Sequence, residues 1–231
     1  MARKRRIITF CTILLLSALR CHATLPDEKL IKNIDALYQA MDFSGQEPPA
    51  YDVFRHGLLG YFYLQQSHKL SEKGILTLID FRKSANSKRL WVLDIIKKKL
   101  LYLALTAHGQ NTGEVFASKF SNKHNSHQSS LGFYITGNTY VGKHGISLKL
   151  LGVESGINDQ AEARAIVMHG ADYVSDEYIK KFGRLGRSFG CPAVPMELHK
   201  QIITALAGGT CLFIYYPDKE YLSKTKVKVT V

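Results

Sequence analysis

The sequence is poor in cysteine and proline and has no long apolar run. Four cysteines in 231 residues are too few for a disulfide scaffold. Six prolines and eighteen glycines without a repeating period exclude collagen-like and low-complexity chains. The one extended apolar run, residues 7–19, falls short of the roughly 20 residues of a transmembrane helix. With 45% hydrophobic and 22% charged residues, the composition is that of a globular protein with a substantial core.

The N-terminus has the features of a secretory signal. A basic segment at residues 3–6 precedes the apolar run, and Cys21-His22-Ala23 provides small residues at the two positions that a signal peptidase reads. We therefore expect residues 1–23 to be a signal peptide, removed on export to the periplasm or cell wall. An uncleaved anchor, which would tie the protein to a membrane, is the alternative. Cleavage after Ala23 leaves 26 basic and 19 acidic residues, a net charge of +7.

The remaining positive charge lies in separate lysine clusters, at residues 97–99 and 224–228. Neither cluster has the interleaved aromatic residues of a nucleic-acid platform, so we expect no nucleic-acid partner. An acidic cell wall or membrane surface suits a basic exported protein better. Solvated lysines that only aid solubility explain the charge equally well.

Helical patterns come first in the chain and strand patterns follow. Apolar spacing predicts helices at residues 27–41 and 52–66, and helix start and stop signals predict shorter ones at 176–182 and 195–206. Strand patterns occur at residues 75–81, 90–96, 100–107, 132–136, 146–151, 165–168 and 211–216. The long polar segment 109–130 is either mobile or functional. This order predicts one mainly β domain with a helical N-terminal part.

Of the two cysteines that signal cleavage would leave, Cys191 has the features of a nucleophile. It lies in a glycine-containing turn, residues 188–191, that follows Arg184 and Arg187 and precedes a predicted helix. Positive charge and backbone N–H groups at such a turn are expected to lower the pKa of the thiol and to hold an oxyanion. Cys211 lies in an apolar strand, and a Cys191–Cys211 disulfide is the alternative.

His169 is the candidate base for this thiol. It ends an apolar strand, where a sheet can hold the ring rigidly, and 21 residues with a predicted short helix separate it from Cys191. A histidine placed beside a cysteine accepts the thiol proton. His124 and His127 form an H-x-x-H pair without a nearby acidic residue or cysteine, so we expect no metal site there.

These segments resemble the YkuD-type murein L,D-transpeptidase catalytic domain family. A strand ending in His169-Gly170, followed by Ser188-Phe189-Gly190-Cys191, is similar to the family signature, and the similarity covers about residues 50–222. The wider similarity rests on Tyr51-Asp52-Val53-Phe54, Leu78-Ile79-Asp80-Phe81, Ser130-Leu131-Gly132-Phe133-Tyr134, Gly142-Lys143-His144-Gly145, His169-Gly170-Ala171-Asp172-Tyr173-Val174 and Gly183-Arg184-Leu185-Gly186-Arg187-Ser188.

The resemblance implies a mainly β, β-sandwich-like catalytic domain with flanking α-helices over residues 51–222. Residues 24–50 would then be a helical N-terminal segment and linker, and residues 223–231 a basic tail. The implied substrates are peptidoglycan stem peptides, with a wall-attached protein as a further acceptor, and neither a metal nor another cofactor is implied.

The resemblance also assigns roles within the site. Cys191 would attack the carbonyl of the L-centre residue before a terminal D-amino acid, and His169 would be the base. The Gly190 and Cys191 amides would hold the oxyanion, with Ser188 shaping the turn. Two positions depart from the common signature, because Phe189 stands where it has His and Ala193 where it has Arg.

The departure at Ala193 leaves the binding of a substrate carboxylate to another cation. Arg184 and Arg187 are the candidates, and His144 and Gly170 are further candidate substrate-binding residues. Two other functions remain open. One is an L,D-carboxypeptidase or amidase, in which water replaces the acceptor amine. The other is a catalytically silent wall-binding protein in which Cys191 is tied to Cys211.

Overall fold

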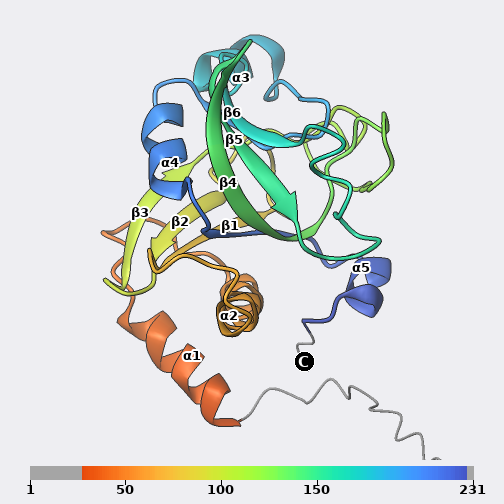
Figure 1. The fold of residues 1–231 in the computed structure, drawn as a ribbon. Coiled ribbons are helices and arrows are strands. Elements are labelled where there is room, and N and C mark those ends of the chain that lie inside the picture. Colours follow the sequence, from red (N-terminus) through yellow and green to blue (C-terminus); the bar gives the residue numbers. More distant parts are fainter. Residues whose placement is uncertain (1–27, 228–231) are drawn as a thin grey trace, which may run out of the picture.

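Eight strands form one mixed sheet in the order β3-β2-β1-β8-β4-β5-β6-β7. The structure, a computed structural model, describes residues 28–227, so the predicted signal peptide and the last four residues of the predicted basic tail lie outside it (Figure 1). The strands are β1 Ile75–Asp80, β2 Leu90–Asp94, β3 Lys99–Ala104, β4 Gly132–Gly142, β5 Gly145–Gly152, β6 Val167–Ala171, β7 Ala193–Pro195 and β8 Cys211–Tyr215. The helices are α1 Glu28–Ala40, α2 Tyr51–Gln66, α3 Asp176–Phe182, α4 His199–Leu206 and α5 Lys219–Lys224.

The predicted mainly β fold with flanking helices is confirmed, and α1, α2 and α3 lie within a residue of their predicted bounds. Pro195, predicted to open a helix, is instead the last residue of β7, because residues 193–195 pair in parallel with β6. As a result α4 begins only at His199. The short helix α5 was not predicted. No helix of the described part of the chain is long and apolar enough to cross a membrane.

The two edges of the sheet meet. The segment after the edge strand β3 reaches the other edge strand, β7, where the Ala107 N–H donates to the Ala193 carbonyl at 2.9 Å. At the next residue along the chain, the His108 carbonyl accepts a hydrogen bond from the Ser188 N–H at 3.0 Å. The resulting bridges, Ala107 to Ala193 and Gly109 to Ser188, fold a single sheet back on itself. This closure accounts for a sandwich-like core without a second sheet.

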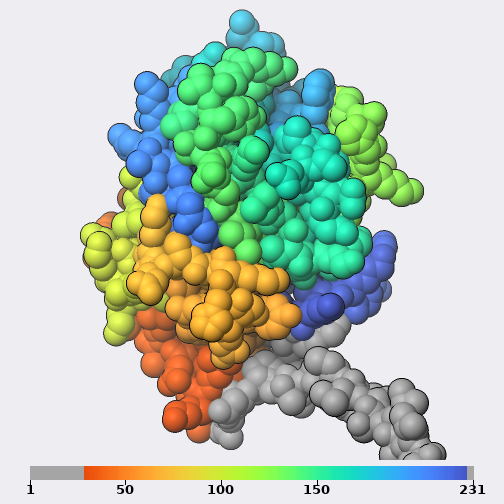
Figure 2. Space-filling view, viewed as in Figure 1, coloured from red at the N-terminus to blue at the C-terminus, as the bar shows by residue number. Residues whose placement is uncertain are grey.

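Helix α2 covers the β1 and β8 part of the sheet (Figure 1, Figure 2). Two helical glycines, which lower helix propensity, lie where it touches the strands. A Cβ on Gly60 would lie 2.0 Å from Phe133 Cε1, and one on Gly57 would lie 2.3 Å from Leu78 Cδ2. Close packing of α2 on the sheet therefore requires glycine at both positions.

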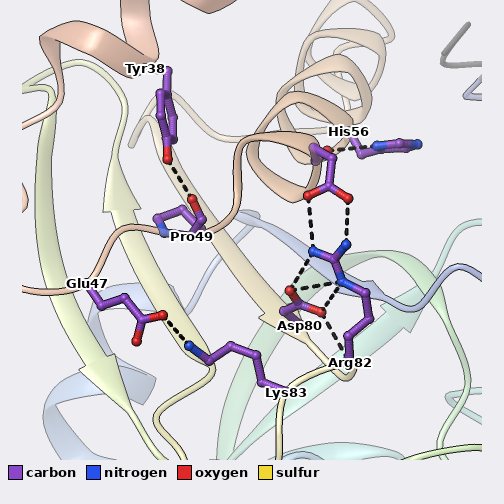
Figure 3. A network of polar contacts seen from close by, with 8 residues as sticks. Tyr38, Glu47, Pro49, His56, Asp80, Arg82 and Lys83 are labelled. Carbon is purple, nitrogen blue, oxygen red and sulfur yellow. Dashed lines mark hydrogen bonds and ion pairs between the residues drawn. The ribbon is translucent and has the colours of Figure 1, made fainter.

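An ion-pair network anchors the start of α2 to the end of β1 (Figure 3). Arg82 donates from Nη1 to Asp52 Oδ2 at 2.6 Å and from Nη2 to Asp80 Oδ2 at 2.8 Å. The Asp80 side chain is only 3% exposed, so its charge depends on this guanidinium. Beside it, Lys83 pairs with Glu47 at 2.5 Å and so holds part of the predicted linker against the sheet.

We predict that Gly60→Ala lowers the free energy of unfolding. Alanine gains about 1 kcal/mol of helix propensity over glycine. The new methyl group, however, overlaps the Phe133 ring, and overpacking a core costs about 1–3 kcal/mol, so destabilisation should win. Urea unfolding measures the change. Gln65→Ala, at an exposed position of the same helix, is the control and should change stability little. A more stable Gly60→Ala protein would contradict the packing described.

Candidate active site

Strands β6 and β7 bring Cys191 and His169 to one face of the sheet. In their parallel register His169 lies opposite Ala193. Cys191, two residues earlier, is then level with Val167, and the Val167 N–H donates to Cys191 Sγ at 3.5 Å. Because residues two apart on a strand share a face, the thiol and the imidazole lie on the same side. Both line one cavity of about 470 Å³, which we call the Cys191 cleft.

The Ser188 hydroxyl braces the turn that carries the cysteine. It donates to the Cys191 carbonyl at 2.6 Å and accepts the Gly190 N–H at 3.0 Å. Gly190 has a φ of +123°, and a Cβ there would lie 2.8 Å from the Gln128 carbonyl oxygen, so the turn requires glycine. Ser188 thus lies where its expected turn-shaping role needs it. The Gly190 N–H, expected to hold an oxyanion, is already engaged by Ser188, which leaves the Cys191 N–H beside its own sulfur.

The Cys191 thiol is protonated at neutral pH. Burial raises its pKa, and the smaller opposing effects of the Val167 N–H and the Arg164 charge do not offset this. The expectation of a lowered thiol pKa was therefore wrong, because desolvation of the thiol outweighs the nearby charge and backbone N–H that favour the thiolate. Cys191 is a free thiol, as is Cys211, which is buried in β8. Three strands stand between β8 and β7, so the two thiols are not placed for a disulfide.

The His169 ring is held as a neutral base. Its Nδ1 lies 3.0 Å from the Gly170 carbonyl oxygen, which can only accept, so Nδ1 carries the proton and Nε2 keeps its lone pair. Burial lowers the pKa of His169, and the nearby His144 and Lys143 lower it further, against a smaller opposing effect of the Gly170 carbonyl. Gly170, expected at the substrate, thus contributes a carbonyl that orients the base. Sequence analysis missed this role because it belongs to the backbone.

His144 lies directly against the base. It occupies the two-residue turn between β4 and β5, where Gly142 pairs with Gly145. Its ring stacks on the His169 ring with centroids 4.5 Å apart and an interplanar angle of 22°. The structure therefore places the His144 side chain in the wall of the Cys191 cleft, as expected for a substrate-binding candidate.

The two candidate arginines share one acidic partner. Arg187 lines the cleft and donates from Nη1 to Glu114 Oε1 at 2.7 Å. Arg184 pairs with the same carboxylate through Nε at 3.0 Å and is not among the lining residues. Arg184 therefore lies outside the cleft that it was expected to serve.

Arg164, which sequence analysis did not single out, is a cation of the cleft wall. It lies in an irregular segment between β5 and β6, where no local motif points to it. Together with Lys143 and Arg187 it makes the lining basic, and none of the lining residues is acidic. Such a cleft suits a ligand that carries carboxylates.

One histidine of the H-x-x-H pair is engaged by a ring contact and a hydrogen bond. His127 stacks on Phe189 with ring centroids 4.3 Å apart, and its Nδ1 accepts from Gln110 Nε2 at 3.0 Å. Within residues 28–227, no group of three or more histidine, cysteine, aspartate or glutamate side chains is placed to hold a metal ion. His127 instead packs the polar segment 109–130 against the cysteine turn.

Solved structures, two L,D-transpeptidases among them, align with this chain at low identity. An L,D-transpeptidase from Mycobacterium smegmatis shares 11% identity with a TM-score of 0.38, over 62% of this chain and 59% of that one. An L,D-transpeptidase in complex with imipenem shares 10% identity with a TM-score of 0.38, over the same shares of the two chains. The helical cell shape determining protein Pgp2 of Campylobacter jejuni shares 14% identity with a TM-score of 0.42, over 71% of this chain and 56% of that one.

This chain thus spans less than two thirds of the length of those proteins. No curated protein sequence matches it. A model of the L,D-transpeptidase catalytic domain family matches residues 46–215, a range that includes α2, the closed sheet and the two strands beside the Cys191 cleft. By this match over most of its length, the chain belongs to the L,D-transpeptidase catalytic domain family.

Proposed function

We propose that this protein is an exported cysteine L,D-transpeptidase that acts on peptidoglycan stem peptides through a thioester on Cys191, with His169 as the base. The observation that carries the proposal is the pairing of a free thiol with a neutral imidazole on one wall of a basic cleft. Membership of the L,D-transpeptidase catalytic domain family supports the reaction type.

The chemistry follows from the protonation states of this pair. His169 Nε2 takes the thiol proton as Cys191 Sγ attacks the carbonyl carbon before the terminal D-amino acid. The Cys191 N–H donates to the oxyanion, a contact of a kind worth roughly 3 kcal/mol in the transition state. The imidazolium then protonates the departing amine, the C–N bond breaks and a thioester remains. An acceptor amine attacks the thioester and gives a proton to His169, the C–S bond breaks, and the imidazolium returns the proton to Sγ, so that Cys191 is again a thiol and His169 again neutral.

The substrate class is supported by charge. Stem peptides carry carboxylates, and the Cys191 cleft presents Lys143, Arg164 and Arg187 without an acidic side chain in its lining. The net positive charge expected after signal cleavage would also favour an anionic wall. Export rests on the basic and apolar segments of residues 1–23.

Hydrolysis by the same site is the second candidate, as an L,D-carboxypeptidase or amidase. Both reactions pass through the thioester and differ in whether an amine or water accepts the acyl group. Incubation of the mature protein with defined muropeptides, with and without an amine acceptor, separates them. A cross-linked product that needs the acceptor supports transpeptidation, whereas release of the terminal residue alone supports hydrolysis.

We predict that Cys191→Ala abolishes acylation and that His169→Ala leaves a slow reaction whose rate rises with pH. Without the imidazole, hydroxide still generates the thiolate. Imipenem, the compound bound in one of the solved L,D-transpeptidases, is a probe whose adduct intact-protein mass spectrometry detects. The double variant should lose no more than Cys191→Ala, because both groups serve one step. Cys211→Ala is the matched control and should acylate normally. An adduct on Cys191→Ala would place the chemistry elsewhere.

The pH dependence of acylation provides a separate prediction. The reaction needs neutral His169, whose pKa lies below its ordinary value, so acylation should persist below pH 6.5 and fall only as pH drops through the lowered pKa. His144→Ala removes a side chain that lowers the pKa of His169 and exposes the His169 ring. The pKa of His169 should therefore rise, and acylation by this variant should begin to fall at a higher pH than acylation by the native protein. Imipenem acylation rates across pH measure both limbs, with circular dichroism at each pH to exclude unfolding. A native acid limb above pH 6.5 would contradict the neutral-base assignment.

A further inference from the structure

Arg164 occupies a tight turn that leads into β6. The Ala165 N–H donates to the Glu162 carbonyl at 2.9 Å and the Ile166 N–H to the Ala161 carbonyl at 2.9 Å. Ala165 has a φ of +53°, a left-handed conformation that is unusual for alanine. The turn is held in this conformation directly beside the cysteine, since Cys191 Sγ lies 3.8 Å from the Ala165 carbonyl oxygen.

The Arg164 guanidinium is bound by residues 121–130, which we call the 121–130 segment. Nη1 donates to the Ser121 carbonyl at 2.7 Å and to Ser130 Oγ at 2.6 Å. Nη2 donates to the Gln128 carbonyl at 2.6 Å and to Ser126 Oγ at 3.2 Å. All four terminal N–H hydrogens thus have acceptors within the protein. These hydrogen bonds fix the orientation of the planar Arg164 guanidinium, the fork, whereas they would not fix the flexible ammonium group of a lysine.

The 121–130 segment in turn holds the cysteine turn. Ser129 Oγ donates to the Gly190 carbonyl at 3.0 Å, and the Gln128 carbonyl packs on Gly190 so closely that a Cβ would lie 2.8 Å from it. The same Cβ would lie 3.3 Å from Arg164 Nη2. The Arg164 guanidinium therefore lies against Gly190, the residue that precedes Cys191.

No carboxylate among residues 28–227 neutralises the charge of Arg164. Arg187, in the same wall, pairs with Glu114, and Lys143 is exposed to solvent at the β4–β5 turn. Arg164 is half-buried, its partners are neutral oxygens, and it has no ion pair with a described acidic residue. A partly desolvated cation without a counter-charge favours an anion nearby.

We propose that Arg164 is a positioning residue that sets the reactivity of Cys191: its fork fixes the 121–130 segment against the cysteine turn, and its charge stabilises the thiolate. The other titratable groups of the cleft are His169 on β6, Lys143 and His144 on the β4–β5 turn, Arg187 just before the cysteine turn, and Tyr140 and Tyr173. Among them Arg164 is the group whose charge lowers the pKa of Cys191 against the effect of burial.

The proposal rests on the proposed function for its biological meaning, but its test measures the thiol itself. In the mature protein, the rate of Cys191 alkylation by iodoacetamide is measured against pH by mass spectrometry of the Cys191 peptide. Arg164→Gln removes the charge, and we expect a higher apparent pKa of Cys191 and about tenfold slower alkylation below it. Arg164→Lys keeps the charge and should restore most of the rate.

Two further variants separate charge from structure. Ser130→Ala removes one acceptor of the fork without changing the charge, so it should speed amide hydrogen exchange in the 121–130 segment and leave the thiol pKa nearly unchanged. Arg184→Gln, outside the cleft, is the matched control and should leave both unchanged. If Arg164→Gln does not fold, Arg164→Lys and Ser130→Ala are compared instead. A large shift of the Cys191 pKa in Ser130→Ala, which keeps the charge, would contradict a charge effect.

The proposal is overturned if Arg164→Gln alkylates like the native protein, or if Arg164→Lys and Arg164→Gln shift the pKa equally. Failure of the proposed function would look different. In that case the native protein would not react with imipenem or muropeptides, while the dependence of Cys191 alkylation on Arg164 would remain.

Discussion

The closure of the sheet is the constraint on which the site depends. Hydrogen bonds from residues 106–110 to residues 188–193 join the two sheet edges on either side of Cys191. Behind this seam, Arg89 is fully buried and donates to His108 Nδ1 at 2.8 Å. Burial and the Arg89 charge lower the pKa of His108 to about 4, so at neutral pH Nδ1 stays an acceptor for the Arg89 guanidinium. The cysteine turn is thus fixed from both sides before any substrate binds.

The same enclosure decides the chemistry of the pair. Burial disfavours the charged form of each group, so it raises the pKa of Cys191 and lowers that of His169. The resting site therefore holds a thiol and a neutral imidazole rather than an ion pair. In the proposed reaction the proton would therefore move to His169 as Cys191 attacks, which requires the Nε2 orientation that the Gly170 carbonyl holds.

Sequence analysis predicted the features whose causes lie within a few residues along the chain and missed those that depend on distant residues. Helix α3 was predicted to the residue because its signals are local: the Ser175 hydroxyl accepts the Tyr178 N–H, and Gly183 ends the helix with a φ of +74°. Cys191 and His169 could be proposed from the sequence because a local motif carries each of them, and both line one cleft in the structure. Strand β7 was missed because its partners, Ala107 and β6, are distant in sequence. Arg164 was missed for the same reason, since its importance arises from acceptors 34 to 43 residues away.

The two departures from the common family signature lie at positions where the side chains pack against the polar segment or the seam. Ala193 is fully buried, and its carbonyl accepts both the Ala107 N–H and the Thr106 hydroxyl, so the seam has no room for a long cationic side chain. Phe189, which is 64% exposed, stacks on His127 and extends the contact between the cysteine turn and the polar segment 109–130. Positions 189 and 193 thus hold uncharged side chains that make packing contacts. Positive charge near the thiol comes instead from Arg164, outside the signature, whose half-buried guanidinium is held in place by four acceptors.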